Sequence, residues 1–249
     1  MAAKDGQAPE MSFWEHLEEL RGTLFRSLLV VLLFACLGLA CKDWLFAVVF
    51  APAGPDFFLY RLLGWDMSLH LINVEITAPF FVHLRTSFCA ALVLAVPWLL
   101  WEIWKFIAPA LYQGERRAVR GAFWLASILF YVGAAVGYCF ILPVCLRFFL
   151  YYSIGDGIEN LIGLGSYISM FTTMVLVVGL CFEFPSVIAV LSQLGVVTRR
   201  TLRRGRKYAL LVILVLSALV TPSDPVSMLV LALPLYILYE GSILLCRPC

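Results

Sequence analysis

Long apolar runs separated by short polar or basic connections extend along almost the whole chain. A helix rises about 1.5 Å per residue, so an apolar run of about 20 residues can cross a hydrocarbon core about 30 Å thick. The pattern therefore predicts one transmembrane domain with six membrane-spanning helices, over residues 24–45, 78–101, 118–142, 167–194, 208–220 and 226–245.

The first long connection, residues 46–77, is more apolar than a flexible loop would be. Pro52, Gly54 and Pro55 punctuate it and predict turns. The apolar residues 57–63 within it indicate a short interfacial helix.

Three sequence signals predict where helices begin and end. Ser12 followed by Glu15 fits a capping box, so the first helix is expected to begin in water and continue into the first apolar run. The third run is expected to stop near Pro143. Pro225 falls at the first position of the last helix, where proline is favoured.

Prolines inside the apolar runs predict bent helices. Pro97 and Pro185 each remove a backbone hydrogen bond and clash with the preceding turn. The bundle is therefore expected to be cupped rather than cylindrical. The run 208–220 is also short, because it spans only about 20 Å as a helix. Either flanking polar turns extend it or the lipid thins around it, and the sequence leaves both open.

Composition places these helices in a membrane. Of 249 residues, 63% are hydrophobic and 14% are charged, against about 45–50% and about 25% in soluble domains. The chain is therefore expected to be an all-α polytopic membrane protein. A net charge of +2, without a basic cluster interleaved with aromatic residues, argues against nucleic acid as a partner.

Positive charges are distributed unevenly between alternate connections. Fourteen lysines and arginines fall on one side of the predicted bundle, and only Lys42, Arg61 and Arg147 fall on the other. Cytoplasmic connections carry an excess of lysine and arginine. Both termini are therefore expected to be cytoplasmic.

No motif in the sequence indicates catalysis. HExxH, GxSxG and glycine-rich phosphate loops are absent, and the three histidines do not cluster. Most of the eight cysteines lie inside apolar runs, where cysteine behaves as a small hydrophobic residue. Cys246 and Cys249 form a terminal CxxC without a second pair or a nearby histidine, so we expect no metal, no cofactor and no enzyme activity.

A charged segment, residues 13–26, precedes the first apolar run. Glu15 and Glu19 are four residues apart and share a helix face, whereas Arg26 is expected to lie off that face. One interpretation is a solvated helix start, whose acids interact favourably with the helix dipole.

A second acidic position, Glu115, lies in the connection before the third run, beside Arg116 and Arg117. Neighbouring residues on a helix point apart, so Glu115 is expected to be available to a partner. Together with the acids at residues 15–19 it offers two carboxylate sites near the membrane. Each can accept a guanidinium through two parallel hydrogen bonds.

Glu183 is an ionisable residue deep in the fourth apolar run, and such residues mark functional sites by default. One alternative is a protonated acid bonded to a neighbouring helix. Another is the proton carrier of an ion-coupled secondary transporter, which requires inverted repeats and facing intramembrane charges. The sequence has neither.

Four other residues have structural interpretations. Gly133, Gly137 and Gly179 are expected to be positions where helices pack closely. Asp224, directly before Pro225, is expected to cap the last helix.

Five short motifs follow one another along nearly the whole chain. They are HLEELR at 16–21, FIAPALY with ERR at 106–112 and 115–117, FEFP at 182–185, TPSD at 221–224 and LYE at 238–240. In their order, spacing and membrane sidedness they resemble the TatC family, the six-span core subunits of twin-arginine protein translocases.

The resemblance implies a glove-shaped receptor in the cytoplasmic membrane. Such a receptor binds signal peptides with consecutive arginines and recruits single-span subunits of the TatA and TatB type to export folded proteins. It is expected to be a homo-oligomer within the complex, in contact with the lipid bilayer and without a cofactor.

The resemblance also assigns roles by position. Glu19 and Glu115 are implied to receive the twin arginines, with Arg21, Phe106 and Arg117 beside them.

Three further positions match the family, and two depart from it. Glu183 matches the family's intramembrane acid, on the concave side where a partner helix docks, and Pro52 and Asp224 match outer-loop positions of functional interest. The chain departs from the family at Ser223 and Met228, where proline and glutamine are expected.

Overall fold

The computed structural model describes residues 13–67, 69–107, 113–152, 160–221 and 225–246; for residues 113–120 it describes the backbone alone. Over these ranges the structure consists of helices and two very short strands. The elements are α1 (Phe13–Ala40), α2 (Lys42–Phe50), η1 (Ala51–Ala53), α3 (Phe58–Leu63), β1 (Leu71–Ile72), α4 (Ala78–Ile107), α5 (Gln113–Val136), the π-helical turn η3 (Gly137–Ile141), α6 (Leu142–Tyr151), β2 (Ile162–Gly163), α7 (Leu164–Cys181), α8 (Phe184–Gln193), α9 (Arg199–Arg204), α10 (Arg206–Val220) and α11 (Pro225–Leu245).

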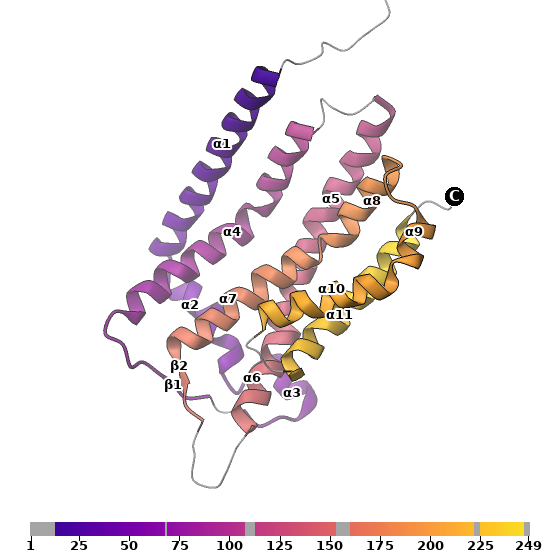
Figure 1. Cartoon of the computed structure of the whole chain (residues 1–249). Helices are drawn as coiled ribbons and strands as arrows, with labels where there is room; N and C mark the ends of the chain where they lie inside the picture. The colour runs from indigo at the N-terminus through magenta and orange to yellow at the C-terminus, as the bar shows by residue number, and fades with distance from the viewer. Residues whose placement is uncertain (1–12, 68, 108–112, 153–159, 222–224, 247–249) are drawn as a thin grey trace, which may run out of the picture.

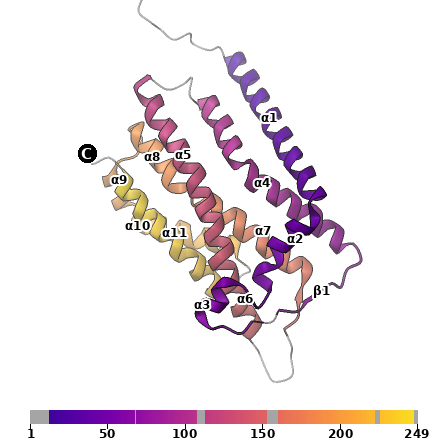
Figure 2. The same cartoon turned by 180° about the vertical axis from the view of Figure 1, so that it is seen from behind.

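The long helices lie side by side, with α1 at one edge of the bundle and the α10–α11 pair at the other (Figures 1 and 2). α1 packs on α4, α5 packs on α7 and α8, and α11 packs on α8 and α10. At the lower end of Figure 1, α2, α3 and α6 close the bundle. There β1 pairs in parallel with β2, Leu71 facing Ile162.

Six helical segments in the described structure are long and apolar enough to cross a membrane. This confirms the predicted helical, polytopic membrane protein. The segments are Leu17–Ala40, Lys42–Leu63, Ala78–Ile107, Phe123–Tyr151, Leu164–Gln193 and Pro225–Leu244.

The segments differ from the predicted spans near the start of the chain and before the last helix. The predicted span 24–45 contains a turn at Cys41, where α1 ends and α2 begins. The predicted loop 46–77 contains the end of α2, η1 and the expected short helix, α3. The predicted span 208–220 is helical as α10, but its 15 residues correspond to only about 22 Å.

The third span does not stop at Pro143, so that prediction is wrong. The helix widens into η3 and then continues as α6, with Pro143 in its first turn. Proline cannot donate a backbone hydrogen bond, and its ring crowds the carbonyl four residues earlier. A π-helical turn immediately before it changes the local register and lets the helix continue.

The fourth span breaks where proline was expected to bend it. α7 ends at Cys181 and α8 begins at Phe184 with Pro185 in its first turn, so Glu183 lies in the break. Pro97, in contrast, lies inside α4, which remains one helix. α11 begins at Pro225 as predicted.

The main apolar core joins α2, α3, α5, α6, α7 and α11, and Tyr60, Tyr167, Ile141 and Leu142 are among its fully buried side chains. α1 lies outside it. Val31 of α1 packs with Ala91 and Ala95 of α4 in a small separate cluster. Within the described structure α1 is therefore held chiefly by α4.

The three predicted packing glycines lie where helices approach closely. A Cβ atom at Gly133 would lie 2.5 Å from the Phe182 side chain, at Gly137 2.7 Å from the Met174 carbonyl oxygen, and at Gly179 2.9 Å from the Phe130 ring. At contacts this short, an added side chain would force a neighbouring group to shift. The prediction of helix-packing positions is confirmed.

We expect Gly133→Ala to lower the free energy of unfolding by about 1–3 kcal/mol, because the added methyl overpacks the contact of α5 with Phe182, directly after α7. Gly121→Ala on the same helix is the matched control, since its Cβ would meet nothing within 4 Å. That substitution should be neutral or stabilise by up to about 1 kcal/mol, through helix propensity. Unfolding in detergent, followed by circular dichroism, measures both. Equal effects of the two substitutions would contradict the packing role.

Candidate functional site

The start of α1 presents one face to α4. On this face Thr23 is buried, Glu19 is half-buried, and Arg26 bonds to Glu102 of α4. Residues 15 and 26 are about three turns apart at about 3.6 residues per turn, so they return to the same side of the helix. The expectation that Arg26 lies off the face of the two acids is therefore wrong.

Glu102 joins α4 to α1 through a buried ion pair, and its side chain is 0% exposed. Its Oε2 accepts hydrogen bonds from Arg26 Nη2 at 2.8 Å and from Arg26 Nε at 3.1 Å. Its Oε1 lies 3.4 Å from Lys105 Nζ, and Arg26 Nη2 also donates to the Thr23 hydroxyl at 3.3 Å. Both carboxylate oxygens thus have cationic partners, which compensates the loss of water around a buried charge.

Sequence reasoning missed Glu102. The second span was expected to end at residue 101, which placed this acid in a connection, whereas α4 continues to Ile107. An acid between tryptophans, three residues before Lys105, was the available signal, because a cation at that spacing lies beside it on a helix. Residue spacing could not predict that Arg26 of α1 pairs with Glu102, because the two are 76 residues apart in the sequence.

Glu19 differs from Glu102 in having no cation beside it. It forms no ion pair with any residue in the described ranges, and its buried Oε2 accepts no hydrogen bond there. A buried acceptor without a donor is unfavourable by about 1–3 kcal/mol. The carboxylate is therefore suited to a donor from outside the described structure. Arg21, two residues on, is exposed and points to another side of the helix.

The helices that carry the other predicted signal-peptide residues reach the same end of the molecule. The start of α1, the end of α4 and the start of α5 lie together at the upper end of Figure 1. Phe106 is half-buried in the last turn of α4. Glu115 and Arg117 lie in the first turns of α5, and their side chains are outside the described structure.

Glu183 lines an apolar groove of about 510 Å³ between α7–α8 and α10–α11. The residue is 8% exposed. The Ser186 hydroxyl lies 2.8 Å from its Oε2 and 2.7 Å from its backbone carbonyl, while its buried Oε1 has no partner among the described residues. The groove is otherwise lined almost entirely by apolar and aromatic side chains, among them Leu180, Phe184, Val212, Leu216 and Tyr239.

Pro52 is buried in η1, at the break after α2. Since it has no N–H, it cannot continue the helical hydrogen bonds of α2. Three tyrosine hydroxyls donate to carbonyls at this break: Tyr138 to Val48 at 2.7 Å, Tyr167 to Val49 at 2.6 Å, and Tyr60 to Pro52 at 2.8 Å. Pro52 thus determines where α2 ends, and the tyrosines tie that end to α3, η3 and α7.

Two sequence predictions fall outside the described residues: the helix cap at Asp224 and the second cysteine of the CxxC, Cys249. Cys246 is buried. Ser12 of the predicted capping box also lies outside the described ranges. Among the residues that were described, no three His, Cys, Asp or Glu side chains come together as a metal site.

The fold and site together define a multi-pass helical membrane protein with partly buried acids at one end and an acid in an apolar groove. The family model described as "Sec-independent protein translocase protein (TatC)" matches residues 15–234. The chain belongs to the TatC family.

Individual relatives agree with this assignment. The protein named Sec-independent protein translocase protein TatC of Blattabacterium sp. subsp. Periplaneta americana (strain BPLAN) is 33% identical over 250 residues, covering 94% of each chain. The protein of the same name from Desulforapulum autotrophicum is 34% identical over 244 residues, covering 98% of this chain and 86% of the relative. A crystal structure described as the twin arginine translocase receptor TatC matches with a TM-score of 0.77 at 31% identity, over 93% of this chain and 97% of that one.

These similarities confirm the resemblance to TatC drawn from the five motifs. They give no support to the ion-coupled transporter. The family is named for protein translocation and not for a chemical reaction.

The ion pair between Arg26 and Glu102 should contribute to the attachment of α1. We expect Arg26→Gln to lower the free energy of unfolding by about 1–3 kcal/mol, because it leaves a buried carboxylate with one distant cation. Glu102→Gln should lower it by less, since the half-exposed Arg26 can turn to solvent. A double-mutant cycle measured by thermal unfolding should give a coupling energy of about 0.5–3 kcal/mol. Additive effects of the two substitutions would show that the pair contributes no coupling.

Proposed function

We propose that this chain is the twin-arginine signal-peptide receptor and core subunit of a translocase that exports folded proteins. The observation that supports this most directly is the contrast between two acids on one helix interface. Glu102 is already neutralised by Arg26 and Lys105, whereas the buried Oε2 of Glu19 has no partner among the described residues. An incoming guanidinium supplies the missing donors.

Arginine fits such a site better than lysine for geometric reasons. A guanidinium offers a planar fork that binds a carboxylate through two parallel hydrogen bonds, and it loses less hydration than an ammonium does. In this proposal Glu19 and Glu115 each receive one arginine of the pair, and Phe106 contributes apolar contact. Arg21 and Arg117 lie beside the two acids in the sequence.

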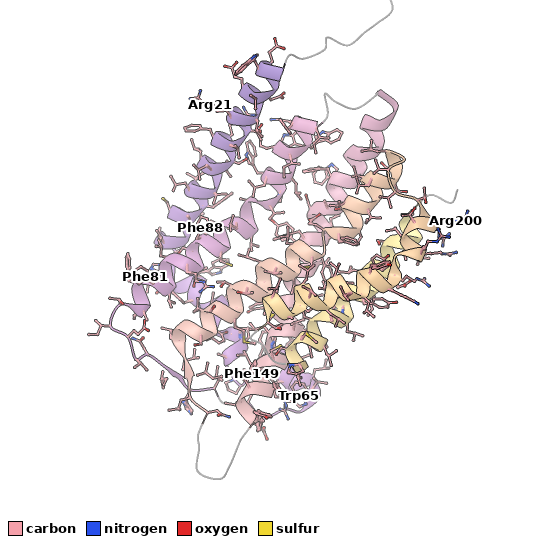
Figure 3. All side chains as sticks on the ribbon, in the orientation of Figure 1. Arg21, Trp65, Phe81, Phe88, Phe149 and Arg200 are labelled. Carbon is pink, nitrogen blue, oxygen red and sulfur yellow. The ribbon has the colours of Figure 1, made fainter. Side chains whose placement is uncertain are left out.

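The distribution of charges supports one orientation of the proposed receptor in the membrane. Arg21 near the start of α1 and Arg200 in α9 lie at the same end of the long helices, whereas Trp65 lies at the opposite end (Figure 3). Basic connections face the cytoplasm. In the proposed arrangement the protein lies in the cytoplasmic membrane with both termini and the peptide site on the cytoplasmic side.

The groove at Glu183 suits a single transmembrane helix of a partner subunit. Its walls are apolar and its one buried acid retains an unpartnered oxygen within the described structure. That oxygen can accept a hydrogen bond from a polar side chain on a TatA- or TatB-type helix, and hydrogen bonds between helices are favourable in lipid. Several copies of the receptor then form the working complex.

We expect Glu19→Gln and Glu115→Gln each to weaken binding of an Arg-Arg signal peptide at least about thirty-fold. Removing one partner of a buried charge pair typically loses at least about 2 kcal/mol. Fluorescence anisotropy of a labelled peptide in detergent measures the affinity. A Lys-Lys peptide should bind the unmodified protein weakly and lose little further affinity in the variants.

Glu18→Gln is the matched control, because Glu18 is exposed on the same helix and lies about 100° around it from Glu19. It removes the same charge from the same helix end. Photocrosslinking from positions 19 and 115 gives an independent measurement of proximity to the peptide. An affinity for the Arg-Arg peptide equal to that of the unmodified protein in both test variants would overturn the assignment.

Glu183→Leu should abolish export of a folded reporter while signal-peptide affinity stays within about two-fold, since the groove and the peptide site are separate. Glu183→Gln should retain part of the export, because an amide oxygen can still accept from Ser186 and its amide can bond to a partner helix. Co-purification of the single-span subunits with each variant measures the docking step. Full export by the leucine variant would exclude a role for this acid.

A further inference from the structure

The segment formed by α9 and the first turn of α10 carries the densest positive charge in the chain. Residues 199–207 contain five arginines and one lysine, and the sequence has no acid between Glu183 and Asp224. In the described structure only Arg206 of this group forms an ion pair, with Glu240 at 2.7 Å. The remaining cations lack acidic partners there, so the segment has a strong uncompensated positive field.

This segment is held in a defined position. The hydroxyl of Thr198 caps α9 by accepting from the Thr201 N–H at 3.3 Å, and the Tyr239 hydroxyl of α11 donates to the Leu202 carbonyl at 2.7 Å. Together with the bond from Arg206 to Glu240, these contacts fix α9 against α11. The cations of α9 therefore have defined positions relative to α11, unlike charges on a flexible loop.

Two of the arginines line a pocket. Its volume is about 330 Å³, and its walls come from Thr198, Arg200, Thr201, Arg204, Gly205 and Tyr208. Hydroxyl groups and guanidinium forks are the side chains that bind phosphate oxygens. None of the described residues that line the pocket carries a carboxylate, so the pocket favours an anionic ligand.

The basic pocket adjoins an apolar surface. Tyr208 lines both this pocket and the groove of about 510 Å³ that contains Val187, Val212 and Leu216. Tyr208 is 77% exposed and Val212 is 53% exposed. A ligand with an anionic head and a hydrocarbon tail would fit both parts at once.

The length of α10 brings these residues to the level of lipid headgroups. Its 15 residues extend about 22 Å, which is less than a hydrocarbon core of about 30 Å. A helix this short draws its flanking residues toward the bilayer, and tyrosine and basic residues are favoured at the interface. Arg204 lies just before α10, and Arg206, Lys207 and Tyr208 form its first turn, so its apolar part is shorter still.

We propose that this pocket and the adjoining end of the groove bind one anionic phospholipid. Arg200 and Arg204 contact its phosphate and headgroup, and one acyl chain lies along Val187 and Val212. An acidic protein segment fits the charge but leaves the apolar groove unused, so a lipid is favoured. The lipid shares part of the groove with the proposed partner helix, but its binding does not depend on the signal-peptide site.

The test is native mass spectrometry of the purified full chain in neutral detergent. Phosphatidylglycerol and phosphatidylcholine of equal chain length are added in competition. We expect the unmodified protein to retain one phosphatidylglycerol in preference to phosphatidylcholine. Because one basic residue near an anionic lipid corresponds to about a five-fold gain in affinity, Arg200→Gln with Arg204→Gln should lower retention about thirty-fold.

The matched control is Arg203→Gln with Lys207→Gln, which removes the same charge from exposed residues that do not line the pocket. Retention in the control should fall less than about three-fold. Equal losses in both double variants would overturn the site, because they indicate only a diffuse field. Val212→Trp, which fills the groove without changing charge, should also lower retention. Displacement of the lipid by glycerol 3-phosphate at equal concentration would overturn the proposal, because it would identify a site for a soluble anion.

Discussion

Satisfaction of backbone polar groups where helices break is the constraint on which this structure depends. An apolar environment offers no water to carbonyls that lose their helical partners. The chain breaks after α2 and between α7 and α8, and each break is supplied with hydroxyl donors. Tyr138, Tyr167 and Tyr60 serve the first break, and Ser186 serves the second by bonding to the Glu183 carbonyl. Ser186 and Tyr60 act locally, whereas Tyr138 and Tyr167 bond to carbonyls 90 and 118 residues away in the sequence, so two of the bonds that permit the first break also connect α2 to η3 and α7.

The attachment of α1 is a separate matter, because α1 takes no part in the main core. Its contacts are made largely with α4, through a small apolar cluster and through the Arg26–Glu102 ion pair. The α1–α4 interface therefore determines where Glu19 lies relative to the rest of the molecule. A buried ion pair is weak evidence for stability but defines register between two helices well. In this interpretation the Arg26–Glu102 pair determines the position of Glu19 relative to α4.

The sequence predicted the helices and the class of protein because membrane spans depend on composition over about 20 residues. It also predicted the close helix packing at Gly133, Gly137 and Gly179, because small residues inside apolar runs mark helix contacts. It singled out Glu183 because an ionisable residue inside such a run marks a functional site, and that role stays a prediction. It failed at Pro143, because a π-helical turn has no residue signature that distinguishes it from a helix end. It missed Glu102 because pairing with Arg26 joins residues 76 positions apart, and no local spacing reports such a contact.

One end of the bundle has a mixed, slightly acidic edge at α1, with three glutamates and two arginines in residues 13–26, and a purely basic edge at α9. The acids at residues 15–19 lie on α1, whereas the cations at residues 199–207 lie around α9, and Arg21 and Arg200 mark these two edges in Figure 3. Fields from exposed charges fall off over about 8 Å at physiological salt, so each edge acts on its own surroundings. A basic peptide approaching this end is attracted at α1 and repelled at α9. In these two proposals the anionic lipid and the signal peptide bind at opposite edges, so they do not compete for one surface.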